Sequence, residues 1–179
     1  MGDAEARAWL VQRFTPPVYR FALRMLGDEQ DARDAAQDTM IKVLRSLDRY
    51  DDNWRFTTWI FGIARNTCID EHRRRRRRGD PVDDEVADGQ PGPHELSSRA
   101  ERARLLHAAL DDVPPLYRDV LILYHFEHLK YEEIAEALDV PMGTVMNRIF
   151  RARKKLREAL AARGGAEPAA LEERLGGGP

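Results

Sequence analysis

Hydrophobic residues along this chain recur at helical spacing in two blocks, which a stretch of polar and charged residues separates. The clearest buried face of the first block comprises Ala36, Met40, Val43, Leu44 and Leu47. That of the second block comprises Val145, Ile149, Ala152 and Leu156. Intervals of three and four residues bring side chains to one side of a helix, whereas strands need alternation. Since no convincing strand pattern occurs, we predict an all-α fold of two small helical domains.

Proline and glycine mark the ends of the predicted helices, because proline breaks a helix interior and glycine closes a C-terminus. In the first block, residues 1–78, we predict helices over 4–14, 18–26, 28–47 and 57–77, with a polar loop over 48–55. In the second block, residues 96–162, we predict helices over 96–111, 116–127, 131–138 and 144–160. We expect residues 163–179 to form a frayed tail rather than a weak helix across 169–175.

The net charge of −2 hides a very uneven distribution of charge. Residues 73–78 are six consecutive arginines, and residues 148–157 contain six basic residues and no acid. Acids gather over 28–38 and over 79–95, a segment rich in proline and glycine that we predict to be a flexible acidic linker. Basic and acidic segments of this kind indicate several partners of opposite charge, although any one of them could be a solvated face.

Several classes of protein are excluded by what the sequence lacks. No apolar run approaches the roughly 20 residues that a membrane span needs, and the N-terminus has no secretory pattern. The chain shows no phosphate loop, nucleophile elbow or zinc-protease motif, and His125 and His128 lack a third metal ligand at suitable spacing. We expect a cytoplasmic protein without enzymatic activity, membrane insertion, metal or cofactor, in which the single cysteine, Cys68, is buried and unreactive.

The strongest motif is a predicted helix-turn-helix formed by residues 131–138 and 144–160. Ala135 provides the small residue where the helices cross, Thr144 is expected to cap the second helix, and Asp139 to take a left-handed conformation at the turn. The second helix has an apolar face and a basic face, as a helix in the DNA major groove requires. An αα-hairpin with a basic surface is the alternative. The candidate DNA contacts are Thr144, Met146, Asn147, Arg148, Arg151, Arg153, Lys154 and Lys155.

The helix predicted over 57–77 mixes aromatic and basic residues, a combination that suits unstacked bases. For Trp59 a place in the core and a role in base stacking both remain open, whereas we expect Phe61 in the core. The arginine run could also be a solvated helix end. On the helix over 28–47, the macrodipole accounts for the first acids. It does not account for exposed Asp34 and Asp38, which predict a docking surface for a basic partner.

Taken together, these motifs resemble the extracytoplasmic-function (ECF) sigma factors of bacterial RNA polymerase over nearly all of residues 14–160. The resemblance implies that DARDAAQDTM, residues 31–40, docks on the β′ subunit. It implies that residues 56–73 melt and read the promoter −10 element, and that residues 110–156 bind the β subunit and read the −35 element. Arg33 stands where the family usually has an acid, so the resemblance leaves the β′ contact to the neighbouring acids and Gln37. Met146 and Asn147 also depart from the usual residues, which predicts an unusual −35 preference.

The resemblance and the residues together assign two further candidate sites. Contacts to the −10 element are expected from Asn53, Trp54, Trp59, Arg65, Asn66, Asp70, Arg73 and Arg74. Docking on the polymerase core is expected from Asp31, Asp34, Gln37, Asp38 and Lys42. The resemblance also implies an anti-sigma partner and a linker that runs toward the RNA path. We expect the isolated chain to bind promoter DNA poorly. A stand-alone helix-turn-helix regulator and an RNA-binding adaptor are the alternatives.

Overall fold

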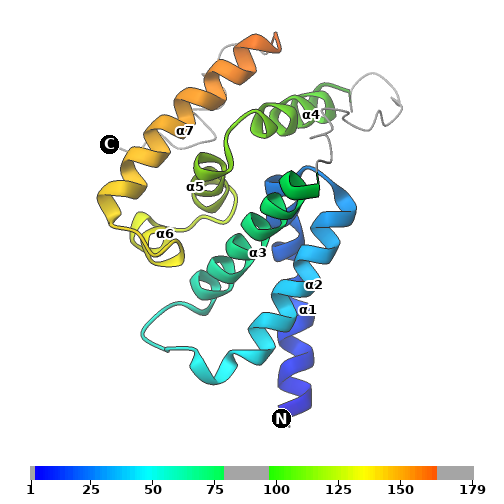
Figure 1. Cartoon of the computed structure of the whole chain (residues 1–179), viewed down its shortest axis with the longest axis vertical. Helices are drawn as coiled ribbons and strands as arrows, with labels where there is room; N and C mark the ends of the chain where they lie inside the picture. Colours follow the sequence, from blue (N-terminus) through cyan, green and yellow to red (C-terminus); the bar gives the residue numbers. More distant parts are fainter. Residues whose placement is uncertain (1–2, 79–96, 165–179) are drawn as a thin grey trace.

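The computed structural model describes residues 3–78 and 97–164, and over these ranges the protein is all-helical, as predicted (Figure 1). The helices of the first block are α1 (Asp3–Leu26), α2 (Glu29–Arg45), a short 3₁₀ turn (Leu47–Arg49) and α3 (Phe56–Arg78). Those of the second block are α4 (Ser97–Asp111), α5 (Pro115–His125), α6 (Tyr131–Ala137) and α7 (Met142–Ala162). The predicted acidic linker and most of the predicted tail lie outside the described residues.

The N-terminal helix differs from its prediction, because α1 runs through Pro16 and Pro17 without a break. Each proline removes one backbone donor from the helix. Just before them, the Thr15 hydroxyl donates to the Val11 carbonyl of the preceding turn at 2.7 Å. The prediction of two helices over 4–14 and 18–26 is therefore wrong. Its C-terminal boundary is confirmed, because Gly27 with φ of 75° follows the last helical residue.

Other boundaries follow the local chemistry of the sequence. Asp28 caps α2, and its carboxylate accepts a hydrogen bond from the Asp31 backbone N–H at 2.8 Å. Pro114 precedes α5, and Pro115 occupies its first turn, where the missing N–H costs nothing. Both ends of each helix in the second block lie within about two residues of the predicted bounds, which is the usual uncertainty of helix ends.

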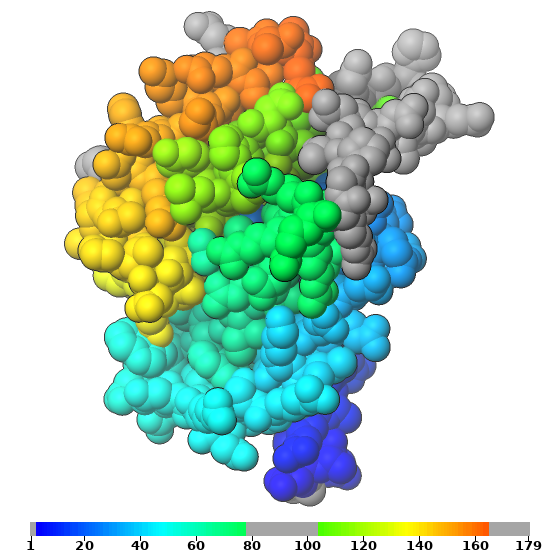
Figure 2. All heavy atoms as spheres, in the orientation of Figure 1, coloured from blue at the N-terminus to red at the C-terminus, as the bar shows by residue number. Residues whose placement is uncertain are grey.

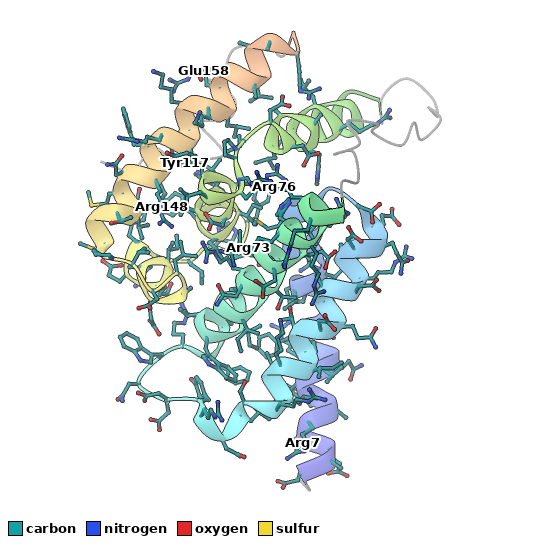
Figure 3. All side chains as sticks on the ribbon, viewed as in Figure 1. Arg7, Arg73, Arg76, Tyr117, Arg148 and Glu158 are labelled. Atoms are coloured by element: carbon teal, nitrogen blue, oxygen red, sulfur yellow. The ribbon has the colours of Figure 1, made fainter. Side chains whose placement is uncertain are left out.

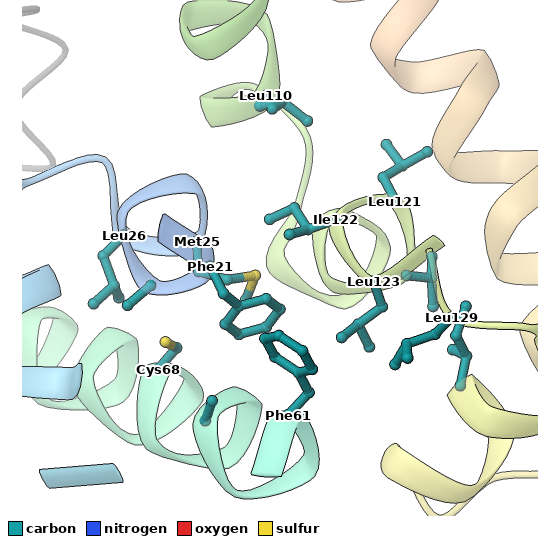
Figure 4. Packing of buried hydrophobic residues seen from close by; sticks show 14 of the residues in the cluster. Phe21, Met25, Leu26, Phe61, Cys68, Leu110, Leu121, Ile122, Leu123 and Leu129 are labelled. Carbon is teal, nitrogen blue, oxygen red and sulfur yellow. The ribbon is translucent and has the colours of Figure 1, made fainter. Parts of the chain in front are cut away.

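One continuous apolar core joins the two blocks. Figure 4 shows Phe21, Met25 and Phe61 from the first block beside Ile122 and Leu123 of α5. The rings of Phe21 and Phe61 lie 5.6 Å apart, so Phe61 is a core residue as expected. The thiol of Cys68 is also buried, and burial raises its pKa to about 12, which keeps it protonated and unreactive. In the space-filling view the second block lies directly against the first (Figure 2).

The contact between α3 and α6 brings two backbones unusually close. A Cβ atom placed on Gly62 of α3 would lie 2.9 Å from the Ala137 carbonyl oxygen of α6, a separation that real Cβ atoms do not adopt. Glycine is therefore required where these helices touch. Around this point Arg55 and Glu133 form an ion pair at 2.9 Å. The guanidinium of Arg24 lies 4.2 Å from the Phe126 ring centre. The blocks thus meet through both backbone approach and paired side chains.

Candidate nucleic-acid interface

The predicted helix-turn-helix is formed by α6 and α7, with Ile134, Leu138, Val145 and Ile149 buried between them. Asp139 has φ of 51°, which confirms the left-handed turn residue. The role of Thr144 differs from its prediction. The N-cap of α7 is Pro141, and Thr144 already lies inside the helix, because Pro141 sets the extended backbone that precedes the first turn. The Thr144 N–H donates to the Pro141 carbonyl at 2.8 Å.

The basic face of α7 is divided into an exposed and a packed part. Met146, Asn147, Arg151 and Lys154 are exposed to solvent. Arg153 and Lys155 are half-buried and lie over the rings of Tyr124 and Tyr117, at 5.6 and 5.8 Å from the ring centres. Cation–π contacts of this kind hold the stems of both side chains beside α5. Of the predicted −35 contacts, Asn147 and Arg151 thus remain exposed to solvent.

Phe150 is a candidate contact that sequence reasoning missed. Its side chain is 73% exposed on the same side of α7 as Met146 and Asn147. The spacing of four residues between Met142, Met146 and Phe150 is visible in the sequence. Met146 was predicted to be exposed, but the matching spacing of Met142 and Phe150 was not recognised, because apolar residues at helical spacing are ordinarily assigned to a core.

Arg148 faces the other way, toward the junction of the two blocks. One terminal nitrogen, Nη1, is buried and makes no hydrogen bond within the described residues. The charge of Arg148 acts on Asp119 of α5. Figure 3 shows Arg148 on α7 and Arg73 and Arg76 on α3. Arg148, one of the candidate −35 contacts, thus lies partly within the contact between the two blocks, called here the closed arrangement.

Candidate −10 residues on α3 fall into two environments. Asn66, Asp70, Arg73 and Arg74 are exposed, and the two arginines pair with Asp70 at 3.5 Å and with Glu71 at 3.1 Å. Arg65 instead donates from Nε to Asp119 Oδ2 at 3.0 Å, and Asp119 is fully buried. Burial raises the pKa of the Asp119 carboxyl, while the charge of Arg65 opposes that shift. The Arg65 guanidinium is therefore paired with a residue of the second block.

The start of α3 carries an aromatic cluster. Trp59 is half-buried, and its ring centre lies 5.2 Å from that of Tyr50 and 5.5 Å from that of Phe56. Trp59 therefore packs against the core while remaining partly exposed, and its role in base stacking stays a prediction. In the preceding loop Asn53 is exposed and Trp54 is 51% exposed. The Tyr50 hydroxyl donates to the Trp54 carbonyl and steadies this loop.

Among the candidate docking residues of α2, Asp34, Gln37 and Asp38 are exposed. Asp31 differs, because its carboxylate pairs with Arg75 of the arginine run. The ammonium of Lys42 donates to the Thr67 hydroxyl at 3.0 Å and so links α2 to α3. Three of the five residues therefore remain available to a partner, and two tie the helices of the first block together.

An apolar groove of about 680 Å³ lies beside these exposed residues, and the sequence did not indicate it. Gln37 and half-exposed Ile41 contribute to its wall, so the groove and the polar surface of α2 are continuous. Its lining residues come from two helices: Val11, Thr15, Pro16 and Tyr19 of α1, and Arg33, Ala36, Gln37, Met40, Ile41 and Leu44 of α2. The uninterrupted helix through Pro16 builds one of its walls.

His125 near the helix-turn-helix gives a prediction on pH. Burial and the charges of Arg153 and His128 lower its pKa to about 4, below the ordinary value of 6.5. Between these two values the unfolded chain binds a proton that the folded chain does not. Stability should therefore fall as the pH drops from 7 toward 4. In thermal unfolding at pH 7 and pH 5, His125→Phe should lose less stability than the wild type. Gln12→Ala, which changes an exposed and non-titrating side chain of α1, is the control, and equal losses in all three proteins would contradict the prediction.

Comparison with known proteins gives the family of the chain. Residues 10–78 match Sigma-70 region 2, and residues 103–156 match Sigma-70, region 4. ECF RNA polymerase sigma factor SigW of Bacillus subtilis (strain 168) is 32% identical, over 89% of this chain and 91% of that protein. SigE of Mycolicibacterium smegmatis is 39% identical over 89% of this chain, which spans 65% of the SigE length.

Solved structures agree with this assignment. The sigma factor RpoE of Bartonella quintana, solved with the anti-sigma factor NepR, superposes with a TM-score of 0.67 and 25% identity. The match covers 90% of this chain and 98% of that chain. CnrH, solved with the cytosolic domain of CnrY, gives 0.67 and 28%, over 90% of this chain and 91% of that chain. This chain belongs to the ECF sigma factors, which bind the RNA polymerase core and direct initiation at particular promoters. No helix within the described residues is long and apolar enough to cross a membrane.

Proposed function

We propose that residues 1–78 dock on the polymerase core and read the −10 element, while residues 96–162 read the −35 element. The observation that carries this proposal is α7, the second helix of a helix-turn-helix, with a buried apolar side and an exposed polar and basic side. Asn147 and Arg151 contact base edges, and Lys154 contacts phosphate. The chain works in the cytoplasm as a binding subunit and performs no catalysis of its own.

The closed arrangement of the two blocks explains why the free chain should need the polymerase. Promoter elements at −35 and −10 lie about 25 base pairs apart, or roughly 85 Å along the duplex. In the structure α3 touches α6, the neighbour of the −35 helix, and Arg65 is engaged by Asp119. One closed molecule therefore cannot place both helices on their elements. Residues 79–96 could span up to roughly 60 Å when extended, which permits the blocks to separate on the polymerase.

The docking surface combines the exposed face of α2 with the apolar groove between α1 and α2. Apolar side chains of the core enter the groove, while Asp34 and Asp38 contact basic residues at its edge. Such a surface has the apolar centre and polar rim of ordinary protein interfaces. Because the two solved relatives were captured with anti-sigma partners, we propose that an anti-sigma factor also binds this chain.

Charge reversal tests the docking assignment. We expect the Asp34→Lys, Asp38→Lys double variant to bind purified core polymerase about tenfold more weakly, which corresponds to about 1.4 kcal/mol. Both side chains are exposed, so the melting temperature should not change. Asp3→Lys, a charge reversal at an exposed position at the start of α1 and outside both expected core-binding segments, is the control and should bind normally. Core affinity and melting temperature that both match the wild type would remove α2 from the interface.

A further inference from the structure

The exposed surface of α7 carries two parallel rows of side chains. The polar row comprises Asn147, Arg151 and Lys154, all exposed. The second row, called here the apolar ridge, comprises Met142, Met146 and Phe150, which are 47%, 50% and 73% exposed. Residues four apart lie on one face of a helix, so the three side chains are neighbours. The ridge therefore runs beside the polar row along the first half of the helix.

None of the three ridge residues belongs to the apolar core of the described residues. Exposed apolar side chains that adjoin one another mark interaction sites more often than isolated ones do. Exposure of these three apolar side chains to water is unfavourable, and the packing of the helices does not require it. The ridge therefore calls for a partner with apolar groups at matching positions.

The charges around the ridge indicate what that partner is. Arg151 and Lys154 flank it, and the first acid that follows on α7 is Glu158. A partner that covers the ridge must therefore be neutral or negatively charged where it lies beside these two side chains. In the major groove the phosphates supply negative charge, and the thymine C5-methyl group is the apolar feature of the base edges. Thymine-containing DNA matches both properties of this surface.

We propose that the apolar ridge reads thymine methyl groups in the −35 element, with Met146 and Phe150 as the contacting side chains. The inference rests on the proposed function, because it assumes that α7 enters the major groove there. Asn147, adjacent to Met146 in the polar row, pairs with adenine through N6 and N7. An A·T pair offers the adenine edge and the thymine methyl side by side. The two rows of α7 thus select A·T pairs by two independent chemistries.

Replacing thymine by deoxyuridine tests the proposal, since it removes the methyl group and leaves base pairing intact. Holoenzyme assembled from the full chain and purified core would first select a promoter from a library randomised around position −35. Each thymine of the selected element is then replaced singly by deoxyuridine. Burial of one methyl group is worth about a fourfold change in affinity, so we expect about fourfold weaker binding at one or two positions. Replacements outside the element should have no effect.

Protein variants connect this loss to the ridge. In the Met146→Ala, Phe150→Ala double variant, thymine and deoxyuridine promoters should bind equally well. Trp9→Ala, which removes an apolar side chain 54% exposed on α1, should keep the fourfold discrimination. Thermal unfolding checks that both variants fold.

Three results would overturn the proposal and are distinguishable from one another. A selected −35 element whose thymines all tolerate deoxyuridine would refute methyl reading while leaving DNA recognition by α7 intact. A library from which no −35 element emerges would refute the proposed function of α7 itself. Discrimination that persists in the double variant, together with weaker core binding, would assign the ridge to a protein interface.

Discussion

Gly62→Ala is expected to separate the two helical blocks and to tighten binding of the chain to core polymerase by roughly tenfold. The added methyl would lie 2.9 Å from the Ala137 carbonyl, which belongs to backbone that cannot rotate away. Alanine is a better helix former than glycine by about 1 kcal/mol, so α3 itself gains stability. The added methyl therefore destabilises the contact between the two blocks and not α3 itself. If core binds only the open form, its apparent affinity rises with the open fraction.

Energy transfer between dyes on α2 and α7 measures the separation, and titration with core measures the affinity. Gly143→Ala is the matched control, because it makes the same change in α7 with no atom within 4 Å of the new Cβ. Only the Gly62 variant is expected to show low energy transfer between the two dyes and tighter binding to core polymerase. A Gly62 variant that opens but binds core no better would show that closure does not compete with the polymerase.

Arg118→Met is expected to lower the free energy of unfolding by roughly 3–5 kcal/mol, because it removes the buried partner of an ion pair. Arg118 is 5% exposed and connects the blocks at their centre. Its guanidinium donates to the Met25 carbonyl of α1 at 2.7 Å and to the Asp111 carbonyl at 2.6 Å. It also donates to the Val113 carbonyl and to the Asp111 carboxylate. Methionine fills much of the volume but supplies no donor to these acceptors, and it leaves the Asp111 carboxylate without its ion pair.

Denaturant unfolding at pH 7 measures this loss. Arg33→Met is the control, because Arg33 is exposed and pairs with Glu29 at 2.8 Å on the surface of α2. Surface pairs contribute at most about 1 kcal/mol, so the control should unfold close to the wild type. A loss below about 1 kcal/mol in Arg118→Met would show that water satisfies the acceptors and that the junction is weak.

Local chemistry made most helix boundaries predictable. Asp28 as a cap, Gly27 as a terminator and Pro115 in a first turn each act within a few residues, and a single sequence displays them directly. The two wrong predictions of helix bounds both involve proline, which can break a helix or lie within its first turns. Pro16 and Pro17 predict a break but are accommodated inside α1, and Pro141 begins α7 earlier than Thr144 would. Propensity is a weak guide where packing favours continuation of a helix.

Contacts between the blocks could not be predicted, because they pair residues far apart in the chain. The pairing of Arg65 with Asp119 and the approach of Gly62 to Ala137 follow from the packing of whole helices, which no local pattern encodes. The same is true of the groove between α1 and α2. Phe150 is a different case. Its spacing from Met146 was available, and only its exposure distinguished it from a core residue.

Transcription on a defined template tests the central claim most directly. Purified core polymerase would be given this chain and a template carrying the −35 and −10 elements that it selects. The account predicts run-off transcripts from one start site that depend on the chain, and their loss when either element is scrambled. Transcripts from core that are unchanged by adding the chain, or initiation that ignores both elements, would contradict it.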